Sequence, residues 1–396
     1  MKDQENTLTG EQILANVIAL APTVRESRDE IERERRLPVH LVDAMKKGGA
    51  FRIAMPREWG GPELDPMSQL AILEALSIAD ASVGWCAMIG CSGGYLTGFL
   101  EQKVAREMYP DIDVFTANAL TPTGRALKVK DGYRVSGRWP FGSGCQHSTW
   151  LVGGCMVYEG DRQSFTSEGV PATRQCFFPT RDAEILDTWY TTGLRGSGSC
   201  DFAINDYFVP EERTFSYQDV KFYRSGPLYR FFANLLFHFP GPALGVARAA
   251  IDTLIDAGTR PRRLTTVGGK LQAGELRDDA FVQDAVGRAE AILAAARAYL
   301  FNTMSEVWDE LVGGREIPPR LLAHFLMVHS HVYAMSTQAV ELVYKARGGS
   351  SVYSSGLLDR CMRDALTMNQ HVTNSLRSYG MAGRILLGLP GEFLLF

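Results

Sequence analysis

The sequence of 396 residues has none of the features that mark secreted or membrane-spanning proteins. Its seven cysteines are scattered, without a CxxC pair or zinc spacing, and such an odd set is typical of a reducing cytoplasm. The beginning of the chain, from Met1 to Asn6, is polar and has no signal-peptide apolar region. No run of about 18 apolar residues occurs, so we expect no membrane span. The chain is therefore expected to be cytoplasmic.

An excess of positive charge and the common nucleotide and metal motifs are also missing. The formal net charge is −4, which offers no basic surface for nucleic acid or anionic lipid. No GxGxxG motif stands between a strand and a helix, so no nicotinamide site is expected. His324, His329 and His331 lie close in sequence, but no nearby carboxylate or cysteine completes a metal site. We therefore predict no metal and no nucleic-acid or membrane partner.

What is present predicts an α+β protein, mainly α, built from three blocks. Hydrophobic residues make up 45% and charged residues 22% of the chain, ordinary values for a globular protein of two or three domains. Apolar residues at helical spacing predict an N-terminal helical domain over residues 1–113. Short apolar runs between Gly, Pro and Asp-Gly signals predict a small central β-domain over 114–221. Long periodic segments predict a C-terminal four-helix bundle over 222–396.

Individual helices and strands are expected within these blocks. The predicted N-terminal helices are 12–32 with a kink or break at Pro22, 37–47, 67–79, and a buried helix over 82–100. The predicted strands include 127–129, 133–135, 150–152, 175–178 and 202–204. The predicted bundle helices are 239–257, 278–312, 318–346 and 357–378.

The most informative segment runs from Trp139 to Trp150, after a predicted hairpin turn at Asp131-Gly132. It gathers two tryptophans, a phenylalanine, glycines, serines and a histidine in one stretch. Aromatic rings can lie against a flat ligand, glycines let backbone N–H groups approach it, and a serine hydroxyl can donate or accept a hydrogen bond. This mixture suits a planar heteroaromatic cofactor such as a flavin. A strand end closed by an aromatic core plug is the alternative interpretation.

Several short motifs, in a fixed order, resemble those of one family. They are Phe51–Pro56 followed by Trp59-Gly60-Gly61, Ala79–Trp85, Trp189 with Gly193–Ser199 and Val209-Pro210, Arg347–Ser350, and Arg360–Asp364. Together they resemble the acyl-CoA dehydrogenase fold, and within it the flavin-dependent monooxygenases that form the oxygenase component of two-component aromatic hydroxylases. The resemblance extends from about Gln12 to Leu389. It implies an N-terminal helical domain, a central β-domain, a C-terminal four-helix bundle and a homotetramer.

The two branches of this fold differ in the catalytic base that is expected near the C-terminus. In many dehydrogenases a glutamate follows an Arg-Asp pair by about two helical turns and removes the α-proton of a thioester. Here the pair is Arg363-Asp364, and no Asp or Glu occurs from residue 365 to 391. The resemblance to the monooxygenase branch instead makes His371 the catalytic base, since an imidazole with a pKa of about 6.5 can deprotonate a phenol near neutral pH. A core or surface histidine on a helix is the alternative.

The same resemblance implies roles for further residues. It places the hydroxyl of Ser143 near flavin N5, as a second catalytic group, and a strand-end turn serine is the alternative. The remaining expected cofactor-binding residues are Trp139, Phe141, Gly144, Arg263 in a loop of the bundle, and Gly348, Gly349 and Ser350, which approach the cofactor from a neighbouring subunit. The expected substrate-binding residues are Trp85, Ser92, His147 and His371; His147 could equally support the loop. No histidine lies beside Cys91 or Ser92, as it does in several aromatic hydroxylases, which indicates a different grip on the substrate.

These residues lead to one functional hypothesis and two alternatives. The resemblance implies that a separate NAD(P)H-flavin reductase supplies reduced FAD or FMN, with FAD preferred. O2 then forms a C4a-hydroperoxyflavin that hydroxylates a small aromatic or heteroaromatic substrate; oxygenation of an amine nitrogen or a thiophene sulfur remains open. The alternatives are an acyl-CoA dehydrogenase-type FAD enzyme with a relocated base, and a flavin- or ligand-binding member without catalysis.

Overall fold

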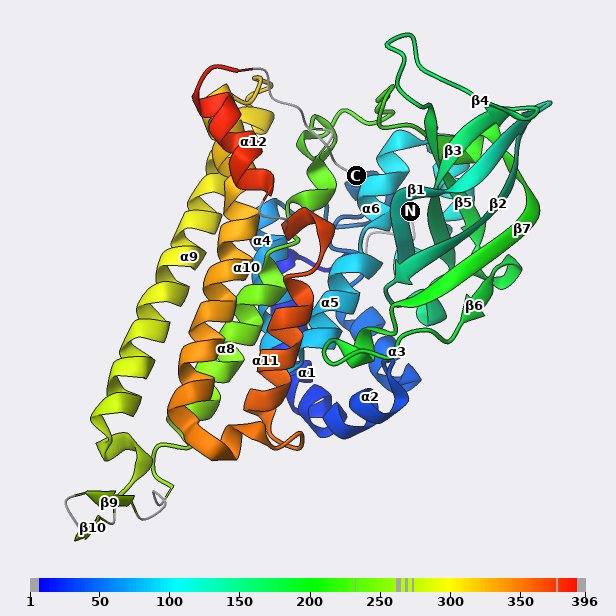
Figure 1. Cartoon of the computed structure of the whole chain (residues 1–396). Helices are drawn as coiled ribbons and strands as arrows, with labels where there is room; N and C mark the ends of the chain where they lie inside the picture. Colours follow the sequence, from blue (N-terminus) through cyan, green and yellow to red (C-terminus); the bar gives the residue numbers. More distant parts are fainter. Residues whose placement is uncertain are drawn as a thin grey trace.

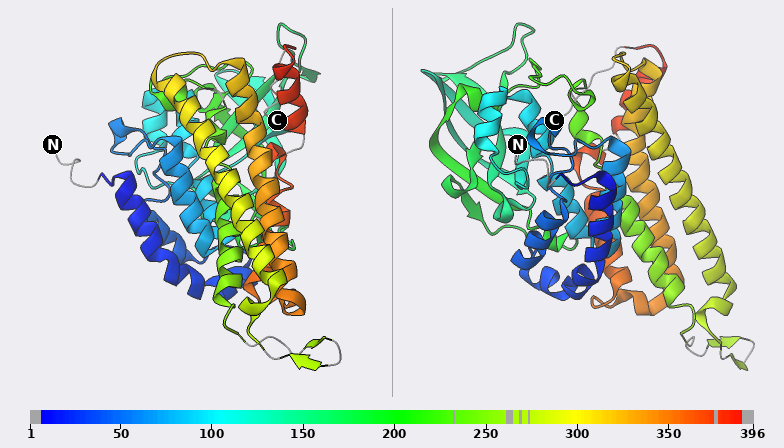
Figure 2. Two further views of the ribbon diagram at one scale, coloured as in Figure 1. Left: turned by 90° about the vertical axis from the view of Figure 1, so that its left-hand side faces the viewer. Right: turned by 180° about the vertical axis from the view of Figure 1, so that it is seen from behind.

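The computed structural model describes residues 7–231, 233–260, 265–267, 270–272, 274–374 and 377–389. A block of helices, a twisted sheet and a bundle of long helices follow one another along the chain (Figure 1). The predicted α+β class, mainly α, is confirmed. The sheet lies on one side of the N-terminal helices and the bundle on the other (Figures 1 and 2).

From residue 7 onward, where the structure describes it, the N-terminal block contains seven α-helices. They are α1 (Gly10–Glu26), α2 (Arg28–Glu34), α3 (Val39–Gly48), α4 (Pro66–Ala79), α5 (Ala81–Gly90), α6 (Gly93–Leu96) and α7 (Gln102–Met108). Pro22 lies inside α1 and the break falls at Ser27 instead, so the predicted break at Pro22 is wrong. The single helix predicted over 82–100 is also wrong, because α5 ends at Gly90 and a separate turn follows. Every residue of α5 is buried, and the Asp80 side chain caps it by accepting the N–H groups of its first turn.

The sheet supplies one wall of the functional site. Its strands are β1 (Thr116–Val129), β2 (Gly132–Gly142), β3 (Trp150–Glu159), β4 (Arg162–Gln163), β5 (Thr173–Pro179), β6 (Glu184–Leu186), β7 (Cys200–Pro210) and β8 (Thr214–Phe215). The order is β6-β7-β2-β1-β3-β5-β8, with β4 beside β3, and β1 and β3 run parallel. The predicted Asp-Gly turn joins β1 to β2, and Asp131 has φ +63°. All the predicted strand segments lie within longer strands.

Trp139 fills the interior of the sheet domain. Its side chain is fully buried beside Phe178 and Phe202, with ring centroids 5.4 and 5.3 Å away. The indole N–H donates a hydrogen bond of 2.6 Å to the Gly154 carbonyl. These contacts match the interpretation of Trp139 as an aromatic core plug.

The C-terminal block is a bundle that packs on the N-terminal helices through α8 and α4. Its elements are α8 (Gly241–Asp256), α9 (Ala280–Val312), α10 (Pro319–Arg347), α11 (Leu357–Met368) and α12 (Arg377–Leu386), with β9 (Thr265–Val267) and β10 (Lys270–Gln272) between α8 and α9. The predicted helix over 357–378 is wrong, because α11 ends at Met368 and a 3-10 turn, η11 (Val372–Asn374), follows it. Asn369, His371 and Thr373 are poor helix formers, which favours a break here.

Two observations concern the state of the cysteines and the expectation that no helix spans a membrane. All seven cysteines are free and buried. In the part of the chain that the structure describes, no helix is both long and apolar enough to cross a membrane.

Candidate active site

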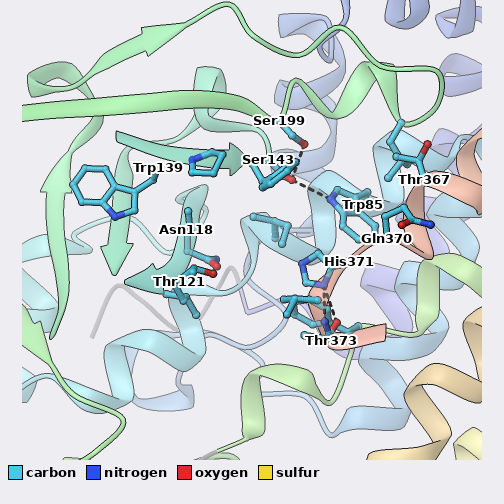
Figure 3. Close-up of a pocket in the computed structure, with 18 of the residues that line it drawn as sticks. Trp85, Asn118, Thr121, Trp139, Ser143, Ser199, Thr367, Gln370, His371 and Thr373 are labelled. Carbon is cyan, nitrogen blue, oxygen red and sulfur yellow. Dashed lines mark hydrogen bonds between the residues drawn. The ribbon is translucent and has the colours of Figure 1, made fainter. Parts of the chain in front are cut away.

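A cavity of about 380 Å³ lies where the sheet, α5, the segment before α8 and the turn after α11 meet (Figure 3). This volume falls in the range of small-molecule and cofactor sites, roughly 300–1,000 Å³. Most of its wall is apolar and aromatic. Its aromatic side chains are Trp85, Trp139, Phe141, Trp189 and Phe239, and its polar ones are Asn118, Thr121, Thr123, Ser143, Ser199, Thr367, Gln370, His371 and Thr373. No Asp or Glu belongs to this described wall.

A tight turn at the end of β2 directs Ser143 into the cavity wall. Phe141 has φ +64° and Gly144 has φ +68°, and the Ser143 N–H donates to the Phe141 carbonyl over 2.8 Å. At Gly144 a Cβ would lie 2.2 Å from Phe115, so only glycine fits. The Ser143 hydroxyl accepts the Trp85 Nε1–H over 3.0 Å and lies 2.8 Å from Ser199 Oγ. The Ser143 hydroxyl thus joins the turn at the end of β2 to helix α5.

His371 lies in the break after α11, between two aromatic rings. Its ring centroid is 5.4 Å from that of Trp85, edge-on, and 5.3 Å from that of Phe239. Burial lowers the pKa of His371 from its ordinary 6.5 to about 4. The imidazole is therefore neutral at physiological pH and holds a lone pair that can take a proton.

Thr373 and Asn374 lie beside one ring nitrogen of His371. Asn374 Nδ2 donates to the Met368 carbonyl over 2.8 Å, and its Oδ1 accepts the Thr373 hydroxyl at 3.1 Å. His371 Nδ1 lies 2.7 Å from Thr373 Oγ1, where the donor depends on the tautomer, and 3.4 Å from the Thr373 backbone nitrogen. These contacts hold Nδ1, and Nε2 is the ring nitrogen left for a ligand in the cavity.

The Arg363-Asp364 pair joins α11 to a turn that lines the cavity. Asp364 Oδ1 accepts the Leu194 N–H over 2.6 Å, and the Leu194 carbonyl accepts the Trp189 indole N–H over 2.8 Å. Burial, helped by the nearby Asp80 carboxylate, raises the pKa of Asp364 to about 8. The Arg363 guanidinium lies 2.7 Å from Asp359. The pair thus positions Leu194 and Trp189 and does not itself line the cavity.

The cavity wall contains the predicted residues Trp85, Trp139, Phe141, Ser143 and His371. Figure 3 shows Ser143, Trp85 and His371 close together and Trp139 to one side, among the strands. Sequence reasoning missed Asn118, Ser199, Gln370 and the other polar groups of the wall. For Ser199 a signal existed, because it ends the motif Gly193–Ser199. The other missed positions lack a comparable sequence signal, since β1 and α11 expose them only through tertiary packing.

Among the predicted residues, Ser92, Gly144 and His147 belong to neighbouring elements but not to the described cavity wall. Ser92 lies behind Asn118: its hydroxyl accepts the Asn118 amide N–H over 3.0 Å and donates to a β1 carbonyl. His147 is largely buried near Arg36 and Lys46, and burial first, then these charges, lowers its pKa to about 4. Gly144 shapes the Ser143 turn. Ser92 and His147 are therefore not part of the described wall, and their contact with substrate stays a prediction.

The remaining predicted cofactor residues are not at this cavity of the same chain. Gly348, Gly349 and Ser350 form a turn at the C-terminal end of α10, at the lower end of the bundle in Figure 1. Arg263 lies outside the described residues. Of the three neighbouring histidines, His329 is held between the Phe325 and Leu236 carbonyls and His324 contacts the Tyr299 hydroxyl. No cluster of metal-binding side chains was found in the described ranges.

The wall of the cavity fits the ring of a flavin. β2 pairs with β1 only from Arg125 onward, and the pairing of β1 with β3 is interrupted between Ala119 and Gly124. Residues 120–123 therefore have no register partner on β2 or β3, and Leu120, Thr121 and Thr123 line the cavity. Pro122 has no N–H and the Leu120 carbonyl accepts the Gln175 side chain, so the remaining backbone groups of this segment are the N–H groups of residues 120, 121 and 123 and the carbonyls of residues 121–123. Such groups can bond the donors and acceptors of a flavin's pyrimidine edge, and Phe141 and Trp189 add aromatic surface.

Comparison with known families agrees with this architecture. The description "Acyl-CoA dehydrogenase, N-terminal domain" matches residues 11–110, and "Acyl-CoA dehydrogenase, C-terminal domain" matches residues 238–376. Together they match well over half of the chain, which belongs to the acyl-CoA dehydrogenase family.

Within that family the similar proteins are flavin-dependent monooxygenases. The chain is 29% identical to the indole-3-acetate monooxygenase of Pseudomonas putida, over 91% of each chain. It is 28% identical to the flavin-dependent monooxygenase oxygenase subunit HsaA of Rhodococcus jostii, over 94% of this chain and 97% of that one. The crystal structure of the HsaA monooxygenase from M. tuberculosis superposes with a TM-score of 0.87 at 26% identity, over 98% and 99% of the chains. The resemblance predicted from the sequence motifs is confirmed.

Proposed function

We propose that this protein is the oxygenase component of a two-component flavin-dependent monooxygenase that hydroxylates a small aromatic or heteroaromatic substrate. One observation supports this more than any other. A neutral His371 faces an aromatic cavity whose described wall has no carboxylate. A thioester dehydrogenase of this fold needs such a carboxylate base, whereas an imidazole can serve as the base in hydroxylation of a phenol.

When bound, reduced flavin supplies the electrons with which O2 is activated for transfer of one oxygen atom to the substrate. His371 Nε2 takes the proton that a phenol-like substrate loses as its ring is attacked. Thr373 holds Nδ1 of the imidazole, and the rings of Trp85 and Phe239 hold the imidazole plane. The aromatic wall favours a flat substrate and excludes water around the reacting atoms.

Ser143 and the free edge of β1 hold the flavin ring in this proposal. The Ser143 hydroxyl would bond the ring near N5, and backbone groups of residues 120–123 would bond its pyrimidine edge. FAD is the preferred form, and a separate NAD(P)H-flavin reductase delivers it reduced. The chain acts as a cytoplasmic homotetramer in which Arg263 and the turn of Gly348, Gly349 and Ser350 contact a cofactor tail, the latter from a neighbouring subunit. The domains extend over residues 1–113, 114–221 and 222–396.

A product assay with labelled oxygen tests the function. The protein is mixed with a flavin reductase, NADH, FAD or FMN, and a panel that includes resorcinol, indole-3-acetate, an aromatic amine and a thiophene. A product that gains one atom of ¹⁸O from ¹⁸O2, in amounts dependent on this protein, supports the proposal and shows which atom is oxygenated. In parallel, the protein with oxidised FAD is mixed anaerobically with acyl-CoA thioesters. Bleaching of the flavin by a thioester, without any labelled product, would identify a dehydrogenase instead, and flavin binding without either reaction would indicate a non-catalytic member.

A further inference from the structure

Three buried serine hydroxyls form a continuous hydrogen-bonded row beside the cavity. Ser197 Oγ lies 2.7 Å from the Leu194 carbonyl oxygen and 2.7 Å from Ser199 Oγ. Ser199 Oγ lies 2.8 Å from Ser143 Oγ, which also accepts the Trp85 indole N–H. We call Ser197, Ser199 and Ser143 the serine chain. Ser143 and Ser199 line the cavity, whereas Ser197 is not part of its described wall.

The carbonyl at one end decides the direction of every hydrogen bond in the serine chain. A carbonyl oxygen only accepts, so Ser197 must donate its single hydrogen to Leu194. Ser199 must then donate to Ser197, and Ser143 must donate to Ser199, because any other arrangement sets two lone pairs against each other at 2.7–2.8 Å. The Trp85 N–H takes one lone pair of Ser143 Oγ. A single lone pair remains, so toward the cavity the Ser143 hydroxyl can only accept.

We infer that Ser197 and Ser199 are positioning residues that make Ser143 an obligate hydrogen-bond acceptor and thereby favour reduced over oxidised flavin. This inference rests on the proposed function, which brings a flavin to the cavity. N5 of the flavin ring carries a hydrogen in the reduced state and only a lone pair in the oxidised state. The reduced ring donates to Ser143, whereas the oxidised ring sets one acceptor against another and loses a hydrogen bond.

The position of Ser143 favours N5 over the other donor of the ring. Trp85, which bonds Ser143, also contacts His371 through its ring, so Ser143 borders the part of the cavity where substrate and flavin meet. N5 belongs to the reacting part of the flavin. N3–H, a donor in both redox states, belongs to the pyrimidine edge, and the unpaired backbone of residues 120–123 offers partners for it.

The sharpest test removes a hydroxyl that lies outside the cavity wall. In Ser197→Ala the Leu194 carbonyl keeps the Trp189 N–H and the backbone N–H of residue 197 as donors, so no buried group is orphaned. Ser199 can then reverse its hydrogen, and Ser143 becomes free to donate to oxidised N5. Ser199→Ala releases the Ser143 hydrogen directly, and Ser199→Thr, which keeps the hydroxyl, is the rescue variant. Ser77→Ala, which removes a buried serine hydroxyl bonded within α4, is the matched control.

The measurements are the dissociation constants of oxidised and anaerobically reduced flavin and the midpoint potential of the bound flavin. One hydrogen bond between neutral groups corresponds to about a five- to tenfold change in the ratio of the two affinities. We expect Ser197→Ala and Ser199→Ala to lose this preference for reduced flavin. Their midpoint potentials should be lower by about 20–30 mV, since a tenfold change in the affinity ratio corresponds to about 30 mV for two electrons. Ser199→Thr and Ser77→Ala should keep the wild-type ratio and potential.

The possible failures are distinguishable. If the wild-type protein binds neither form of flavin, the proposed function fails. If it binds flavin and both alanine variants keep the wild-type ratio, or lower both affinities equally, Ser143 faces N3–H or no donor, and only the serine-chain inference is overturned.

Discussion

Replacing His371 should separate flavin binding from hydroxylation. In His371→Ala the imidazole is lost from between Trp85 and Phe239, while Ser143 and the β1 edge, which hold the flavin ring in the proposed function, stay in place. General-base catalysis contributes typically about 10²–10⁴-fold to a rate, so product formation should fall by that factor. Oxygen consumption should continue, because flavin and O2 still meet, and hydrogen peroxide should replace the hydroxylated product.

The lowered pKa of His371 also predicts how the rate of hydroxylation depends on pH. With the pKa lowered to about 4, roughly 99% of the imidazole is neutral at pH 6, against about a quarter for an ordinary histidine of pKa about 6.5. The wild-type protein should therefore show no acidic limb of kcat/KM between about pH 5 and 7 that belongs to this residue. Any fall in rate from its protonation should begin below pH 5.

The assay compares product, peroxide and NADH consumed for the wild type, His371→Ala and His371→Gln, which retains bulk without a base. Flavin affinity and thermal unfolding serve as controls, since both should be near wild type in His371→Gln. Fully coupled product formation in both variants would remove His371 from the chemistry. An acidic limb near pH 6.5 that disappears in the variants would show that the imidazole is solvated and the reasoning from burial is wrong.

Three further predictions concern the residues that support the site. Asp364→Ala should lower the free energy of unfolding by about 1–3 kcal/mol, because it leaves the buried Leu194 N–H without an acceptor. Asp364→Asn keeps an acceptor and, since the pKa of Asp364 is raised to about 8, should unfold at pH 7 with nearly the wild-type free energy. Chemical denaturation measures both variants. Gly144→Ala should cost at least about 2 kcal/mol, from its φ of +68° and the clash with Phe115, and a thermal midpoint equal to wild type would contradict this. The folded pKa of His147 is lowered to about 4, so the unfolded chain binds its proton first and the free energy of unfolding should fall as pH drops from about 6.5 to 4, by up to about 3 kcal/mol. Urea titrations across this window should show a smaller fall in His147→Gln, and an unchanged fall would rule out His147 as its source.

The local pattern of the sequence predicted the α+β class, mainly α, correctly. Apolar periodicity and Gly or Asp-Gly signals are local properties, and each long helix and each β run buries the face that its own spacing presents. The branch of the family was readable for a similar reason. The absence of any Asp or Glu from residue 365 to 391 and the presence of His371 are facts of sequence order alone.

The composition of the site was decided only by tertiary packing. Trp85, Ser143 and His371 lie far apart in the chain and meet because α5, the β2 turn and the break after α11 converge on one cavity. A short motif cannot show that Ser92 and His147 lie outside this cavity. Nor can it show that Ser197 and Ser199 orient the Ser143 hydroxyl, because the direction of a hydrogen bond depends on which acceptor closes the row in space. The sequence determined which side chains were available and which elements they form, and packing determined which of them share a wall and in which direction their hydrogens point.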